Sequence, residues 1–188
     1  MAYRLTGNET IEAVRCSFSD IPADLKPTFD YWDDLRGDRF APTWNDFDLL
    51  KLPLQALPTT HVMDWLPEQD EFRFRFYGSS YAVIHGVDLT GKSLMEMPSK
   101  SLAEFMYGEY LSVVQGREQT LVTYGVRDGD EFVEIERCLR LPLSDDGVSV
   151  TGLVALGLVA VDILDVEDII EDLGGKKVGF KSDIAEHD

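Results

Sequence analysis

Residues 72–93 read FRFRFYGSSYAVIHGVDLTGKS and lie near the middle of the 188-residue chain. In the first part, phenylalanines at every second position alternate with arginines and a tyrosine, which predicts a β-strand with one buried face. Ser79–His85 fits either a second strand or a short helix. The last part, Gly86–Ser93, satisfies the pattern G-x-x-x-x-G-K-S, which holds phosphate groups in many nucleotide-binding proteins. These residues allow two different kinds of protein, and the rest of the chain decides between them.

The segments on either side predict a hairpin and a helix. Thr60–Leu66 has the composition of a strand, and the Pro-Glu-Gln-Asp turn at residues 67–70 would join it to the strand that begins at Phe72. After Ser93 the apolar period becomes helical, since Ser101–Gln115 places its leucine, phenylalanine, methionine and tyrosine side chains on one face. Gly116 then follows as the expected stop.

The second half of the chain returns to the two-residue period of strands. We expect strands at residues 121–126, 131–143 and 148–161, the last of them apolar almost throughout. Asp-Gly pairs at residues 128–129 and 146–147 are strong hairpin signals. They predict an antiparallel meander whose last strand is covered on both faces or lies in a tight oligomer contact.

The remaining segments flank this core. Residues 1–27 show no sustained period and predict an irregular arm. Residues 28–173 are expected to form one domain, with a leading helix capped by Thr28 and stopped by Gly37, and a second helix capped by Asn45 and bent or ended at Pro53. A helix over 165–173 would close the domain, and residues 174–188 are expected to be a flexible tail.

Composition excludes several partners. Lysine and arginine number 17 and aspartate and glutamate 35, giving a formal net charge of −18. A field of that sign repels nucleic acid and anionic lipid, so we expect neither as a partner. No export signal or run of about 18 apolar residues is apparent, which predicts a cytoplasmic protein. Cys16 and Cys138 are then expected to be free thiols.

The order of two strands, a group of helices and three antiparallel strands resembles the PAS domain, in the form of small free-standing proteins of proteobacteria. The matching residues are Tyr31-Trp32, Leu35-Arg36-Gly37, Arg39, Pro42 and Asp46, then Phe74-Arg75, Gly78, Gly86 and Asp88-Leu89-Thr90-Gly91, and finally Leu141-Pro142-Leu143-Ser144 with Asp146-Gly147. The resemblance covers residues 29–161. Trp44 departs from it, because an arginine is expected there.

The resemblance implies an α+β fold with a five-stranded antiparallel sheet, helices inserted after the second strand, further helices at the N-terminus and a helix at the C-terminus. It also implies a sensory or regulatory module in bacterial signal transduction. Such a module acts by binding a small ligand, by contacting another protein, or by both, and has no catalytic activity of its own.

Two alternatives belong to other classes. A nucleotide-binding protein would use residues 86–93, but Val87 and Asp88 suit a phosphate cradle poorly and the hairpin signals contradict the parallel sheet that surrounds such loops. We therefore expect Lys92 and Ser93 to form a surface turn and a helix cap. The other alternative is a small enzyme on a cone-shaped fold. It would need a carboxylate or histidine inside its cavity, which the predicted strands do not show.

A candidate ligand pocket follows from strand parity. Arg137 is the charged residue among the buried-parity positions of 131–143, where it could bind a small carboxylate. It could instead form an ion pair, or a β-bulge could turn it outward. The other candidates for the pocket are Arg75 and Tyr77 on one face of their strand, with Tyr107, Tyr124 and His85.

The sequence carries no flavin, haem or metal signature. Residues 79–116 contain no cysteine for a flavin adduct, and 101–115 contain no histidine for haem. His61, His85 and His187 are too isolated to form a zinc site. The expected partner is a second copy of the chain or another signalling protein. The candidate contact residues are Trp32, Trp44, Val166, Ile169 and Ile170.

Overall fold

The two predicted strand groups form as expected. The computed structural model describes residues 10–160 and 179–182 of the chain. The hairpin consists of β2 (Thr60–Leu66) and β3 (Glu71–Tyr77), and the meander consists of β4 (Thr120–Asp128), β5 (Glu131–Leu143) and β6 (Gly152–Val159). β6 pairs antiparallel with β2, which joins the two groups into one sheet. These five strands confirm the predicted core, and the last one begins four residues later than expected.

Two further strands extend the sheet beyond this core. β1 (Thr10–Arg15) pairs antiparallel with β4, and β7 (Gly179–Ser182) pairs parallel with β1. The sheet therefore has seven strands in the order β3-β2-β6-β5-β4-β1-β7. The prediction of an irregular arm over 1–27 was wrong for Thr10–Arg15. Ile11 and Ala13 of this strand are buried in the core.

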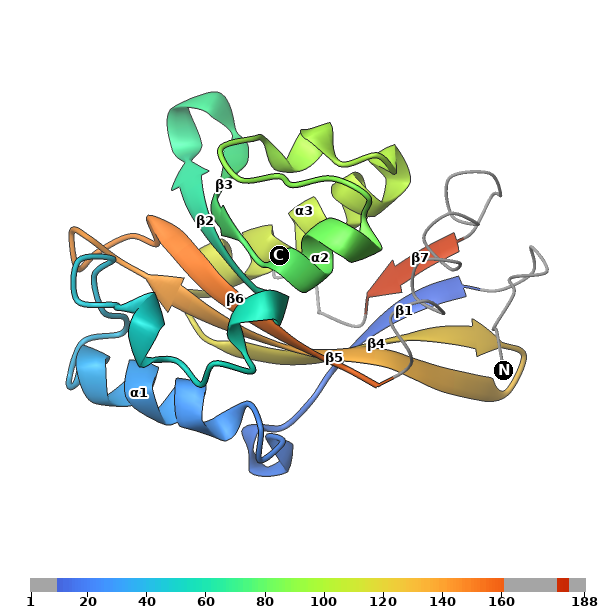
Figure 1. Ribbon diagram of the computed structural model, residues 1–188, viewed down its shortest axis with the longest axis horizontal. Coiled ribbons are helices and arrows are strands. Elements are labelled where there is room, and N and C mark those ends of the chain that lie inside the picture. Colours follow the sequence, from blue (N-terminus) through green and yellow to red (C-terminus); the bar gives the residue numbers. More distant parts are fainter. Residues whose placement is uncertain (1–9, 161–178, 183–188) are drawn as a thin grey trace.

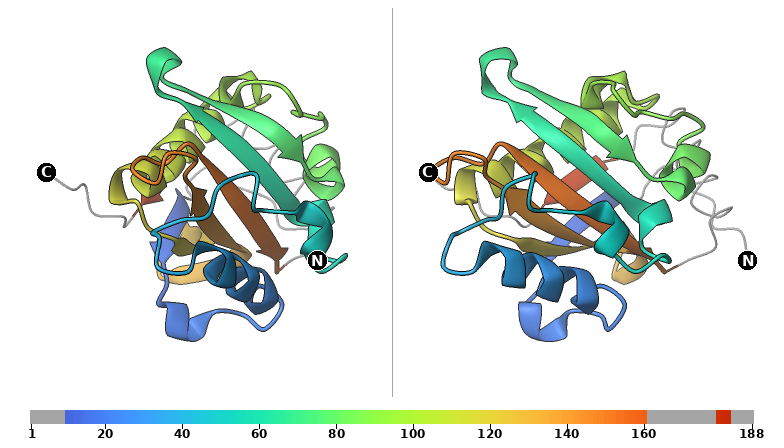
Figure 2. Two further views of the ribbon diagram at one scale, coloured as in Figure 1. Left: turned by 90° about the vertical axis from the view of Figure 1, so that its left-hand side faces the viewer. Right: turned by 60° about the vertical axis from the view of Figure 1, so that its left-hand side comes forward.

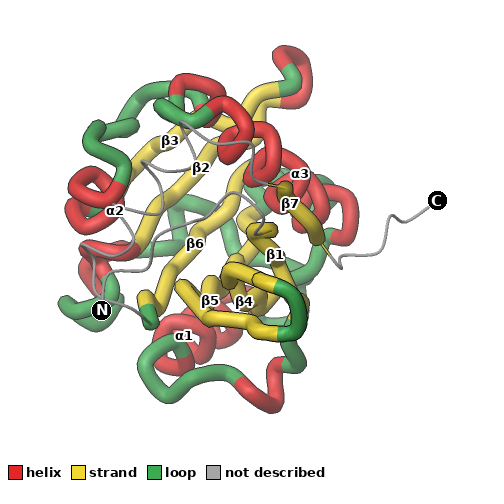
Figure 3. Tube along the Cα trace, turned by 90° about the vertical axis from the view of Figure 1, so that its right-hand side faces the viewer, coloured by secondary structure: helices red, strands yellow, loops and turns green. Residues whose placement is uncertain are grey.

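Helices cover both faces of the sheet, as Figures 1 and 2 show. Helices α2 (Ser79–Ile84) and α3 (Lys100–Gly116) lie between β3 and β4 in the chain, where the resemblance placed inserted helices. They pack on one face, and α1 (Lys26–Arg36) packs on the other. Each face has its own cluster of buried apolar residues. We call them the cavity face and the α1 face, and the tube in Figure 3 shows the curved sheet between them.

Local signals explain the ends of these helices. The hydroxyl of Ser99 accepts a hydrogen bond from the backbone N–H of Leu102 at the start of α3. Gly116 belongs to α3, and the left-handed residue that ends the helix is Arg117, with φ of 51°. The ambiguous residues 79–85 are helical. Within residues 10–160 and 179–182, no helix has the length and apolar character that a membrane crossing requires.

The leading region differs from its prediction in two places. Thr28 lies inside α1 and is buried, and Leu25 stands at the N-cap without a side-chain hydrogen bond. The expected second helix from Asn45 does not form. Residues 45–59 instead make turns and two 3-10 segments, Leu49–Lys51 and Leu57–Thr59, because prolines at 53 and 58 interrupt helical hydrogen bonding. The expected helix over 165–173 and most of the expected tail lie outside the described residues.

Two β-bulges change which side chains face the cavity. In β3, Val62 pairs with Phe76 and Met63 with Phe74, so Arg75 is an extra residue. In β5, Tyr124 pairs with Glu136 and Gly125 with Glu134, so Ile135 is extra. Side chains alternate between faces along a regular strand, and an extra residue reverses this alternation from that point onward.

Trp32 anchors α1 to the sheet. Its side chain is fully buried, and its indole N–H donates a 2.8 Å hydrogen bond to the carbonyl oxygen of Pro142 in β5. The interpretation of Trp32 as a partner contact was therefore wrong, because the side chain lies inside the second core cluster. Burying an indole while satisfying its N–H fixes both the depth and the orientation of α1.

Replacing this anchor tests the corrected role. We expect Trp32→Ala to lower the free energy of unfolding by about 3–5 kcal/mol, as deletion of a large buried aromatic side chain does. The matched control is Asp34→Ala on the exposed side of α1, which we expect to change stability by less than about 0.5 kcal/mol. Urea denaturation followed by tryptophan fluorescence and circular dichroism measures both. A Trp32→Ala protein of unchanged stability would contradict this assignment.

Candidate functional site

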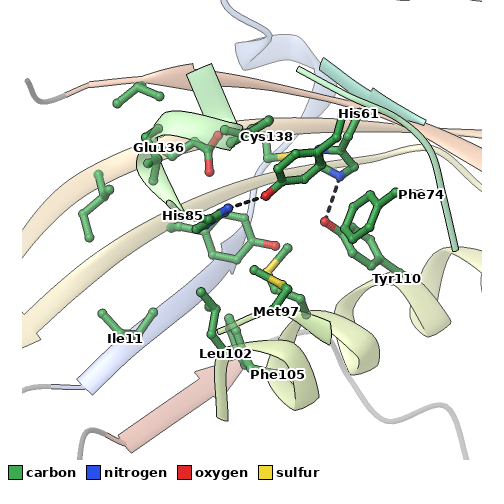
Figure 4. A pocket seen from close by; sticks show the side chains of 17 residues that line it. Ile11, His61, Phe74, His85, Met97, Leu102, Phe105, Tyr110, Glu136 and Cys138 are labelled. Atoms are coloured by element: carbon green, nitrogen blue, oxygen red, sulfur yellow. Dashed lines mark hydrogen bonds between the residues drawn. The ribbon is translucent and has the colours of Figure 1, made fainter. Parts of the chain in front are cut away.

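A cavity of about 110 Å³ lies between the cavity face of the sheet and helices α2 and α3. Aromatic rings form most of its wall. They belong to Phe74, Tyr77, Tyr81, Phe105, Tyr110 and Tyr124, and His61 and His85 add two imidazole rings. Figure 4 shows His61, Glu136 and Cys138 on the strand side and Leu102 and Phe105 on the helix side. The wall thus joins residues that are far apart in the chain.

Three tyrosines bind the polar groups of the wall. The hydroxyl of Tyr77 hydrogen-bonds to Nδ1 of His85, and the hydroxyl of Tyr81 donates to Oε1 of Glu136. The third pair joins the hydroxyl of Tyr110 to Nε2 of His61 at 2.8 Å. Figure 4 shows the two tyrosine–histidine pairs as dashed lines. Polar side chains at the cavity therefore satisfy one another and turn mainly carbon surface toward the space between them.

The absence of a side chain at Gly157 in β6 leaves room for the hydrogen bond between Tyr81 and Glu136. Gly157 lies directly across from Cys138, and a Cβ atom at Gly157 would overlap Oε1 of Glu136 and the hydroxyl oxygen of Tyr81. A glycine is therefore required at this position for this hydrogen bond to form as it does.

Burial shifts the pKa of the titratable groups of the wall toward their neutral forms. Loss of hydration raises the pKa of Glu136 above its ordinary value, and the hydrogen bond from Tyr81 opposes this shift. Desolvation lowers the pKa of His61 to about 3, with a further contribution from the charge of Arg140, and lowers that of His85 to about 4. Burial also raises the pKa of the Cys138 thiol. At neutral pH both imidazoles and this thiol are uncharged.

A buried ion pair lies beside the cavity. Nη1 of Arg140 in β5 donates to Oε2 of Glu109 in α3 over 3.1 Å, and both side chains are almost fully buried. The guanidinium carbon lies 5.2 Å from the ring centre of Tyr110 and 5.4 Å from that of Tyr124. Tyr124 also donates to Glu109 at 3.4 Å. This cluster connects α3 to the sheet through charge, and breaking one partner would leave the other charge buried.

The structure places three of the predicted pocket residues in the wall. Tyr77, His85 and Tyr124 line the cavity. Tyr107 does not, because its hydroxyl donates to Asp70 at the rim of the β2–β3 turn over 2.5 Å.

The two predicted arginines point to the other face. Arg137 donates to Glu134 over 2.8 Å on the α1 face. Residues three apart on a regular strand lie on opposite faces, so the bulge at Ile135 is what brings these two together. Arg75 donates to Asp64 and lies 4.8 Å from the ring centre of Trp44. The prediction of a ligand-binding guanidinium at Arg137 was therefore wrong, and the ion-pair and bulge alternatives were correct.

Sequence reasoning missed the apolar residues of the wall and five that carry polar or titratable groups: His61, Tyr81, Tyr110, Glu136 and Cys138. The expectation that no carboxylate or histidine would lie inside the cavity was wrong. Periodicity assigned β5 a single buried face, whereas α1 covers one face and α3 the other, so both parities are buried after Arg137. No continuous apolar run signalled this, because Arg140 interrupts the apolar residues between Cys138 and Leu143.

The Gly-Lys-Ser stretch forms a turn rather than a phosphate cradle. It follows helix α2, and Asp88 accepts a hydrogen bond from the backbone N–H of Thr90. Ser93 and Glu96 form a capping box at a short 3-10 segment, which confirms the predicted cap. In the part of the chain that the structure describes, no three histidine, cysteine or acidic side chains are grouped to hold a metal ion.

The close approach at Gly157 can be tested by substitution. We expect Gly157→Ala to lower the free energy of unfolding by about 1–3 kcal/mol, because the methyl group displaces Glu136 and Tyr81 from their positions. Gly108→Ala is the matched control on the exposed face of α3, where the new Cβ meets no atom, and it should raise stability by about 0.5–1 kcal/mol. Equal effects of the two substitutions would refute the crowding at Gly157.

The neutral histidines predict a pH dependence. The unfolded state binds more protons between pH 6.5 and pH 4, because the pKa of His85 is about 4 in the folded protein, so stability falls as pH decreases through this range. Glu136 acts in the opposite direction, since its raised pKa favours the folded state as pH decreases. Urea denaturation at several pH values should show a smaller loss toward low pH for His85→Gln than for the wild type. If the stability of His85→Gln and of the wild type changed equally with pH, His85 would not be the source of the loss at low pH.

Comparisons with known proteins agree with this architecture. The model of the PAS domain family matches residues 22–155, which is most of the chain. A search of curated proteins found no significant match. Among solved structures, the PAS domain of BvgS from Bordetella pertussis is similar, with 19% identity, 62% of this chain and 86% of that chain covered, and a TM-score of 0.42. The sheet order, the inserted helices and the family match together show that the chain belongs to the PAS domain family.

Proposed function

We propose that this protein is a sensory or regulatory module that binds a small molecule in the cavity between the sheet and helices α2 and α3. The observation that carries the proposal is the wall itself, in which polar side chains pair with one another around a space of about 110 Å³. Paired polar groups with neutral imidazoles suit reversible binding, because neither histidine carries a charge at neutral pH. The module would act by binding rather than by catalysis.

Occupation of the cavity would reach the surface through the helices. Tyr81 and His85 connect α2 and its C-cap to the sheet, and Tyr110 connects α3 to it. A ligand that displaces any of these rings must change how the helix is held, because the same rings form the wall and the attachment. The stability of α2 and α3 would therefore depend on occupancy, which is the property a sensor needs.

The output would pass to a second copy of the chain or to another signalling protein. Trp44 remains a candidate contact, since it is half-buried and stacks on Arg75 at the edge of the α1 face. Trp32 does not, and the candidates Val166, Ile169 and Ile170 lie outside the described residues.

A cavity-filling substitution tests the proposed site. We expect wild-type protein purified from a bacterial host to release a small molecule on denaturation, detected by mass spectrometry and absorption spectroscopy. Val159→Phe places a larger side chain at the wall and should abolish this release. Val148→Phe is the matched control, because Val148 is 67% exposed and away from the cavity, and it should retain the molecule.

One outcome would contradict the proposed binding site. A ligand retained by Val159→Phe and lost from Val148→Phe would place binding elsewhere. Circular dichroism of both variants shows whether each remains folded before occupancy is compared.

A further inference from the structure

The carboxyl group of Glu136 has one oxygen engaged and one available. Oε1 accepts the hydrogen bond from Tyr81, and among the described residues no group hydrogen-bonds to Oε2. Oε2 therefore keeps some accessible surface, since it is not among the fully buried polar atoms that lack a hydrogen-bond partner. Glu136 lines the cavity, and its side chain is half-buried. A molecule inside the cavity therefore meets this oxygen.

The other polar groups offer a ligand less. The hydroxyls of Tyr77 and Tyr110 are held by histidines. Nδ1 of His61 has no hydrogen-bond partner, but it has almost no accessible surface, so a ligand cannot reach it without moving the wall. Arg140 is fully buried and paired with Glu109. Glu136 is thus one of two polar contacts that the cavity presents, the other being Nε2 of His85, which also has no hydrogen-bond partner among the described residues.

The wall selects against charge. Both imidazoles are neutral at physiological pH, and the nearest guanidinium is already balanced by a carboxylate. An anion entering this space would lose its hydration without gaining a free cation, and a cation would lose its hydration against a wall of mainly carbon surface. A neutral molecule avoids both costs.

The size and shape of the cavity further limit the class of ligand that it can hold. A dry cavity of about 150 Å³ with apolar walls takes up benzene in an engineered protein. The present cavity of about 110 Å³ is of similar size, and its wall combines aliphatic side chains with methionines and aromatic rings, which favour stacking and edge contacts with another ring. One six-membered ring fills it.

We propose that the cavity binds a neutral, single-ring aromatic molecule that carries one hydrogen-bonding group, and that this group pairs with Oε2 of Glu136. The proposal rests on the proposed function, since it names the class of ligand for the same cavity. It assigns Glu136 as the residue that distinguishes such a molecule from a plain hydrocarbon of equal size.

Binding of four small aromatic molecules tests the proposed class of ligand. Phenol, toluene, benzoate and benzylammonium are titrated into the full-length protein, after removal of any bound molecule, by calorimetry or by chemical-shift changes of the wall residues. We expect phenol to bind about tenfold more tightly than toluene, since one hydrogen bond in a dry site is worth about that factor. Benzoate and benzylammonium should bind at least tenfold more weakly than phenol.

Substitutions then assign the effect to Glu136. The double variant Tyr81→Phe/Glu136→Leu removes both members of the buried pair and leaves neither unsatisfied, which spares the fold. It should bind toluene as the wild type does and lose the preference for phenol. The matched control is Glu104→Leu, which removes an exposed carboxylate of α3 that does not line the cavity and should keep the preference. Circular dichroism and a urea titration establish that both variants are folded.

The outcomes separate this inference from the function on which it rests. The inference is overturned if toluene and phenol bind the wild type equally, if benzoate binds best, or if the double variant keeps the phenol preference. If denatured wild-type protein releases a ligand but no aromatic probe binds, the ligand class is wrong and the sensory function stands. If no ligand is released and no probe binds, both proposals fail.

Discussion

The extra residue Ile135 in β5 is the constraint on which the cavity depends. Without it, Glu134 would lie on the cavity face and could not pair with Arg137 on the α1 face. With it, a hydrophobic residue and the adjacent Glu136 both reach the cavity, where Tyr81 fixes the carboxyl group. The bulge thus places two consecutive side chains, Ile135 and Glu136, at the cavity and keeps Glu134 beside Arg137 on the α1 face.

The polar side chains of the cavity wall are buried, and they form hydrogen bonds with one another. Each buried polar group would cost free energy if left alone, and three tyrosines from β3, α2 and α3 remove that cost by bonding to His85, Glu136 and His61. The same bonds tie both helices to the sheet. Under the proposed function, ligand contact and helix attachment use the same side chains, so occupancy and helix stability would be linked without a separate transmission path.

Much of the fold could be predicted from the sequence, for reasons that are local. Alternating aromatics and arginines identify β3, Asp-Gly pairs identify the two hairpins, and the apolar face of Ser101–Gln115 identifies α3. The site could be predicted only in part. Tyr77, His85 and Tyr124 lie in the wall, but Arg75 and Arg137 do not, because parity counted along the chain cannot detect an extra residue in a strand.

The sequence by itself determined the α+β class, the order of the core strands and helices, and the acidic surface, since propensity, turn residues and charge act over short distances. Tertiary structure alone decided that α1 covers the second face of the sheet, which buried Trp32 and both parities of β5. It alone brought Glu136, Tyr81 and Gly157 together. These are contacts between residues far apart in the chain, and the three-dimensional register that creates them is set by packing of the whole sheet.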